Sequence, residues 1–143
     1  MYIIDEVLAA RAVAGQLPVS LTEAPLAICT SAHWRLLRAV LAMQFAAPGP
    51  VGQIQRLLAP MSRPQRVAIH APAPEVLQVM DPRLHSSVAA SFANEHGLNW
   101  FVADHVGAAA FHEAELVFSS ARRVPPAITT GRGTGLVPYR IVT

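Results

Sequence analysis

The chain has 143 residues, 52% of them hydrophobic and 14% charged, a composition that excludes an intrinsically disordered protein. This length is enough for one domain with a proper core. All basic residues are arginine, and the net charge of +2 permits phosphate contacts without requiring them. No apolar run is long enough to span a membrane, and residues 1–6 lack the basic region of a signal peptide, so we expect a cytoplasmic protein without a membrane contact.

Apolar patterns predict strands and helices that alternate along the whole chain. In order, they are a strand over residues 2–4, a helix over 6–16, a strand over 26–30, helices over 33–43 and 51–58, a strand over 75–80, helices over 82–95 and 100–111, a strand over 115–118, a short helix over 124–128 and a strand over 137–142. This alternation favours a single α/β domain over residues 1–143, a three-layer fold with a mostly parallel central sheet and helices on both faces.

Residues that favour helix ends and turns predict several of these boundaries. Ser31 is expected to cap the helix over 33–43, and Asp81 to cap the helix that ends at Gly97. Prolines interrupt residues 61–74, which we expect to form a loop-rich excursion in which residues 66–70 could be a brief strand or a turn of helix. Cys29 is the single cysteine and lies in an apolar run, so we expect it to be a core residue.

Asp104 lies within the most apolar stretch of the chain. From Trp100 to Phe111 the residues leave no polar face, which is typical of a helix that is covered on several sides. An ionised carboxylate is rarely buried there without a partner. Asp104 therefore either faces a functional site or caps the helix, and Asp5, at the end of the first predicted strand, has the same two interpretations.

The residues around Asp104 resemble a known family. Ala103-Asp104-His105-Val106, the alanines that follow, and Ala114-Glu115-Leu116-Val117 look like the segment near the C-terminal end of PIN domains, especially those of VapC-type toxins. The resemblance implies a three-layer PIN-like fold in which an aspartate after the first strand and an aspartate in the buried helix bind metal. Asp5 and Asp104 match these positions and would be the catalytic residues, and Asp5, Glu6 and Asp104 would hold Mg²⁺ or Mn²⁺.

Two acidic positions of the family pattern are not acidic here. Arg35 stands where the family usually has a metal-binding glutamate, and Ser119 and Ser120 stand where its last acidic residue would be. A cation in place of a carboxylate repels a divalent ion. An ion pair from Arg35 to Asp5 or Asp104 could even occupy the metal position.

The resemblance leaves two functions open. The degenerate metal site favours a binding or regulatory module that has kept the fold and lost catalysis. The retained Asp5 and Asp104 favour an active Mg²⁺-dependent endoribonuclease, the toxin of a toxin–antitoxin pair. The partners implied are RNA and a small antitoxin-like protein.

Other polar residues give weaker signals. His105 and His112 lie on one predicted helix at a spacing that does not match zinc-binding helices. His33 is close in sequence to Arg35 and could contact a phosphate or a partner. The glycine-rich residues 131–135 follow no strand and open no helix, so they do not match a phosphate-binding loop.

The high apolar content also predicts an assembly. A domain of this size leaves roughly a third of its unfolded-state surface exposed. Some apolar side chains should therefore remain at the surface, and residues 34–43 and 51–58 are the candidates. We expect a homodimer, or a complex with a small protein, that buries part of these two helices.

Overall fold

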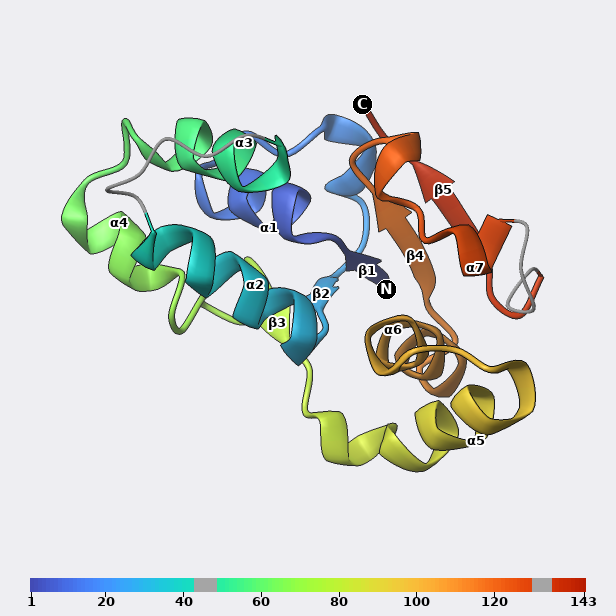
Figure 1. Ribbon diagram of the computed structural model, residues 1–143. Coiled ribbons are helices and arrows are strands. Elements are labelled where there is room, and N and C mark those ends of the chain that lie inside the picture. The colour runs from blue at the N-terminus through green and yellow to red at the C-terminus, as the bar shows by residue number, and fades with distance from the viewer. Residues whose placement is uncertain (43–48, 130–134) are drawn as a thin grey trace.

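A computed structural model describes residues 1–42, 49–129 and 135–143 of the chain. Its centre is a five-stranded sheet with the order β3-β2-β1-β4-β5, in which every pairing is parallel. The strands are β1 (Tyr2–Ile4), β2 (Leu26–Ile28), β3 (Gln78–Val79), β4 (Glu115–Phe118) and β5 (Tyr139–Ile141). Helices cover both faces of this sheet (Figure 1), so the predicted three-layer α/β fold is confirmed.

The helices divide into two layers. The first layer contains α1 (Glu6–Val13), α2 (Thr30–Leu41), α3 (Gly49–Leu58) and α4 (Arg63–Ala68). The second contains α5 (Ser86–His96), α6 (Trp100–Phe111) and α7 (Pro126–Thr129). The described residues also form three short 3₁₀ turns: η1 (Val19–Leu21), η2 (Pro82–Leu84) and η3 (Ala121–Arg123). In Figure 1, α6 lies directly beside the sheet and α5 packs on its outer side.

Successive strand residues supply the two cores in turn, because side chains alternate between the faces of a sheet. On β1, Ile4 packs in the core under α1 to α4, and Ile3 packs in the core under α6. Likewise, Ile28 at the end of β2 packs in the core under α1 to α4, and Cys29, the next residue, packs in the core under α6. Cys29 is fully buried, as predicted from its apolar surroundings.

Three local predictions are wrong. The stretch 61–74, expected to be loop-rich with at most a brief strand or a turn of helix over 66–70, contains the helix α4, which a reciprocal capping box between Ser62 and Gln65 starts. Ser31 does not cap α2, because the helix already begins at Thr30 after Cys29, and Ser31 lies inside its first turn. Asp81 caps only the 3₁₀ turn η2, and α5 begins after His85.

The helices expected to form an interface have buried only part of their apolar side chains. Leu36 of α2 and Ile54 and Leu58 of α3 are at most 1% exposed. Trp34 and Leu41 of α2 stay 55% and 73% exposed, so part of the expected apolar surface remains and self-association stays a prediction. Among the described residues, no helix is both long and apolar enough to cross a membrane.

Close packing between α5 and α6 depends on Gly107. A Cβ atom at this position would lie 2.7 Å from the backbone N and Cα of Ala89. Backbone atoms at that distance leave no space for a methyl group, so Gly107 sets how near α5 approaches α6.

We therefore expect Gly107→Ala to destabilise the protein, although alanine is the better helix former by about 1 kcal/mol. The added methyl would push α5 outward, and overpacking of this kind costs about 1–3 kcal/mol in the free energy of unfolding. Urea denaturation of the two proteins measures the difference. A more stable variant would show that α5 moves freely relative to α6.

Candidate functional site

Polar side chains gather at the carboxyl ends of β1 and β4. From β1 the chain goes on to β2 on one side, whereas from β4 it goes on to β5 on the other, so the two strands flank the point where the strand order reverses. In open parallel sheets this point opens a crevice that commonly holds ligands. Asp5 follows β1, and Ser119 follows β4.

Both carboxylate oxygens of Asp5 are engaged inside the protein. Oδ1 accepts hydrogen bonds from the backbone N–H groups of Val7 and Leu8 at 3.1 and 2.9 Å, so Asp5 caps α1. Oδ2 accepts hydrogen bonds from the backbone N–H and the hydroxyl of Ser119 at 2.8 and 2.7 Å and from Nε of Arg123 at 3.1 Å. The capping interpretation of Asp5 is confirmed, and its second oxygen binds a cationic side chain.

Arg123 also neutralises Glu6. Its Nη2 forms an ion pair with Oε1 of Glu6, while its Nε faces Asp5. The Arg123 side chain is 11% exposed, and those of Glu6 and Asp5 are 7% and 4% exposed. Burial alone would lower the pKa of Arg123, but the charges and hydrogen bonds of Glu6 and Asp5 outweigh it and raise this pKa. The guanidinium is therefore a permanent cation between two buried carboxylates.

Arg35 has a different partner from the one expected. Its Nη1 lies 3.8 Å from Oε1 of Glu6, and its guanidinium carbon lies 3.8 Å above the ring of Phe101. The expected ion pair with Asp5 or Asp104 is wrong, because Arg123 takes the place beside Asp5. The turn η3, which brings Arg123 back to β1, has no sequence signal of its own, so Arg123 was not among the predicted site residues.

Asp104 belongs to a second network. Asn99 caps α6 through a hydrogen bond from Val102 N, so the capping interpretation of Asp104 is wrong. Oδ2 of Asp104 accepts a hydrogen bond from the Ser31 hydroxyl at 2.5 Å, and Oδ1 lies 2.7 Å from Nε2 of the fully buried His85. Asp104 is 8% exposed, so its charge is held mostly by internal partners.

The structure does not bring the three predicted metal ligands into one group. Within the described ranges, the one set of three or more potential ligand atoms that all lie within 4.8 Å of one another is Cys29, Asp104 and His105. Asp5 and Glu6 are not part of it, although they lie at the same edge of the sheet. Ser119 donates its hydroxyl to Oδ2 of Asp5.

His105 lies between the two networks. Burial lowers the pKa of His105, and the charges of Asp104, Glu6 and Arg35 all act on it. Its Nδ1 lies 2.8 Å from the carbonyl oxygen of Phe101, which fixes the proton on Nδ1. His33, in contrast, is a buried structural residue whose Nε2 donates to the carbonyl of Ile69 at 2.7 Å.

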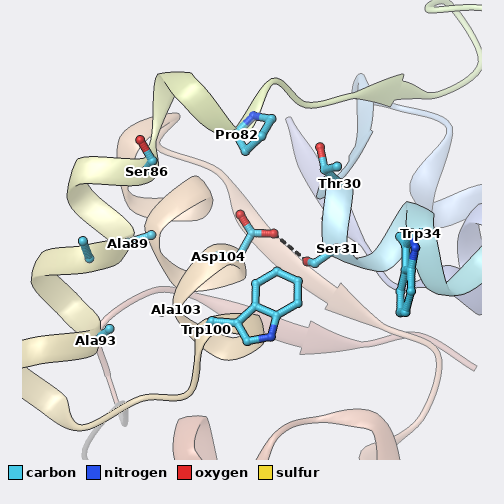
Figure 2. A pocket seen from close by; sticks show the side chains of 11 residues that line it. Thr30, Ser31, Trp34, Pro82, Ser86, Ala89, Ala93, Trp100, Ala103 and Asp104 are labelled. Carbon is cyan, nitrogen blue, oxygen red and sulfur yellow. Dashed lines mark hydrogen bonds between the residues drawn. The ribbon is translucent and has the colours of Figure 1, made fainter.

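Two open cavities adjoin these networks. One, of about 460 Å³, is lined by Glu6 and three arginines, Arg35, Arg38 and Arg123, together with apolar residues of α2 and α3. The other, of about 550 Å³, is mostly apolar (Figure 2). The side chains of Trp34 and Trp100 border this cavity. The Asp104 carboxylate, which also lines it, points toward the Ser31 hydroxyl.

Comparison of the chain with protein-family models, with curated proteins and with solved structures finds no match.

We expect Arg123→Gln to lower the free energy of unfolding by about 3–5 kcal/mol, because it leaves two buried carboxylates without their cation. Denaturant unfolding near neutral pH measures this loss. Arg122→Gln is the matched control, since Arg122 is the exposed neighbour on the same turn. Equal stabilities of the two variants would mean that Arg123 does not hold the acidic pair.

Proposed function

We propose that this protein is a non-catalytic binding module of PIN-like architecture and that it binds single-stranded RNA. The observation that carries the proposal is the ion pairing of Arg123 with both Asp5 and Glu6. A two-metal or one-metal nuclease site needs carboxylates that are free to face a divalent cation. Here the guanidinium already neutralises them from within the protein.

The arginine-lined cavity supports an anionic ligand. Three arginines and one glutamate line it, and when the partner of Arg123 beside it, Asp5, is included, one positive charge remains in excess. The Arg35 side chain is 52% exposed, and Arg38 lies on the exposed surface with its guanidinium carbon 5.0 Å from the Trp34 ring centroid. Guanidinium groups match phosphate oxygens through paired hydrogen bonds, so this face is suited to a phosphate chain.

Two exposed tryptophans favour a single strand over a duplex. Trp34 is 55% exposed and Trp100 is 69% exposed, and both border the apolar cavity (Figure 2). Unpaired bases stack on such rings, whereas bases inside a duplex cannot reach them. Trp34 takes part in both features, because Arg38 stacks on it and the cavity adjoins it.

The second candidate is the Mg²⁺-dependent endoribonuclease. The retained carboxylates favour it, since Asp5, Glu6 and Asp104 all lie at one edge of the sheet. It requires Arg123 to leave the acidic pair when metal binds. Under the binding proposal, Mg²⁺ and Mn²⁺ bind weakly or not at all and RNA stays intact.

Fluorescence anisotropy with a labelled single-stranded RNA in EDTA tests the binding proposal. We expect affinity to fall as salt rises, and Trp100→Ala to weaken binding about 5- to 100-fold through lost stacking. Arg38→Gln should weaken binding and reduce the salt dependence. Phe111→Ala, an exposed aromatic at the other end of α6, and Arg63→Gln, an exposed arginine of α4, are matched controls.

Incubation of the same RNA with protein and Mn²⁺, followed by a denaturing gel, separates the two candidates. Intact RNA together with binding supports the module. Cleavage that Asp104→Asn abolishes would establish the nuclease instead. Absence of binding at low salt and micromolar protein would overturn the RNA proposal.

A further inference from the structure

We propose that Cys29, Asp104 and His105 form a site for Zn²⁺ or another thiophilic divalent metal ion. Cys29 Sγ, a carboxylate oxygen of Asp104 and a ring nitrogen of His105 all lie within 4.8 Å of one another. Donor atoms around a tetrahedral zinc ion are about 3.5 Å apart, so small side-chain movements suffice to close the site. The proposal does not rest on RNA binding, because none of its three ligands is an arginine or tryptophan of the proposed RNA surface, although Asp104 lines the apolar cavity that Trp34 and Trp100 border.

The fold brings the three residues together from two elements. Cys29 follows β2 directly, on the face of the sheet that α6 covers, and Asp104 and His105 are consecutive residues of α6. Cys29 is 0% exposed, and Asp104 and His105 are 8% and 5% exposed. A metal bound among them would be shielded from water on most sides.

Hydrogen bonds from neighbouring groups already orient His105 and Asp104. Since the carbonyl oxygen of Phe101 only accepts hydrogen bonds, His105 carries its proton on Nδ1 and keeps a lone pair on Nε2. Asp104 is oriented by the hydroxyl of Ser31 and by His85. Histidines that donate to a carbonyl and carboxylates that accept further hydrogen bonds are the usual support of a metal site.

The donor set selects the kind of metal. A thiolate and an imidazole suit zinc and its neighbours, whereas Mg²⁺ prefers oxygen ligands. When Zn²⁺ binds, the Cys29 S–H bond is replaced by an S–Zn bond and one proton is released to solvent. The thiolate and the carboxylate then balance the charge of the ion, and the imidazole stays neutral.

The site has an entrance and an open position. Asp104 also lines the cavity of about 550 Å³, which provides a path from solvent. Three protein ligands leave a fourth position for water on a tetrahedral ion. Thr30 and Ser31 line the same cavity, and their hydroxyls donate to the carbonyl oxygen of Met80 and to Oδ2 of Asp104.

Titration of the purified wild-type protein with Co²⁺, followed by absorption spectroscopy, tests the proposal. Because Cys29 is the single cysteine of the chain, a thiolate-to-cobalt charge-transfer band in the near ultraviolet assigns this ligand without any variant. We expect the band to saturate at one ion per chain, together with the intense visible bands of tetrahedral cobalt, and Zn²⁺ to displace the cobalt. Weak octahedral bands without charge transfer would overturn the site.

Variants then assign the remaining ligands. Cys29→Ser should abolish the charge-transfer band, and His105→Gln should weaken binding by more than about 100-fold, since even supporting residues of metal sites cost 10- to 100-fold. His70→Gln, at an exposed histidine of the same chain, is the matched control and should bind as the wild type does. A charge-transfer band that persists in Cys29→Ser would contradict the assignment.

Discussion

The two ion pairs of Arg123 are the interaction on which the carboxyl end of the sheet depends. Asp5 and Glu6 are adjacent in sequence and almost fully buried, and a pair of buried carboxylates without a cation would repel each other and lose their hydration. Arg123 comes from the turn after β4 and binds both. It therefore connects β1 to β4 at the place where the strand order reverses, and it turns a potential metal site into an internal salt bridge.

These ion pairs also determine which charged groups remain exposed at this edge of the sheet. Arg123 offsets one of the two buried negative charges, and Arg35 and Arg38 are the exposed cations on the outer side of the site, which supports the proposed anionic ligand. Asp104, on the other side of the edge, is held by Ser31 and His85 and faces an apolar cavity rather than Asp5. The edge thus has two chemically different halves, and each supports a different proposal.

Much of the fold could be predicted from the sequence, because strand and helix periods are local signals. The apolar run of β4 and the glycine that ends α5 were recognised from a few residues each. The caps were harder to predict: Ser31 has the chemistry of a cap, but its hydroxyl binds Asp104, 73 residues away. A helix also formed in the proline-rich stretch, because Pro64 lies in the first turn of α4, where its missing N–H is not needed.

The candidate site was only partly predictable, because its contacts join residues that are far apart in the sequence. Asp5 and Asp104 stand out because each is a carboxylate inside an apolar stretch. The partners of these residues lie far along the chain, Arg123 at a separation of 118 residues and His85 at 19, and no spacing rule links them. Cys29 was interpreted as a core residue, which it is, but its nearness to Asp104 and His105 arises only from the packing of α6 on the sheet.

A crystal structure of the protein grown with millimolar Mn²⁺, with anomalous diffraction data, tests whether Arg123 excludes a divalent ion from Asp5 and Glu6. We expect the guanidinium of Arg123 to lie between Asp5 and Glu6 and no anomalous peak to appear at these carboxylates. A manganese ion bound by Asp5 and Glu6, with Arg123 displaced toward solvent, would contradict this expectation.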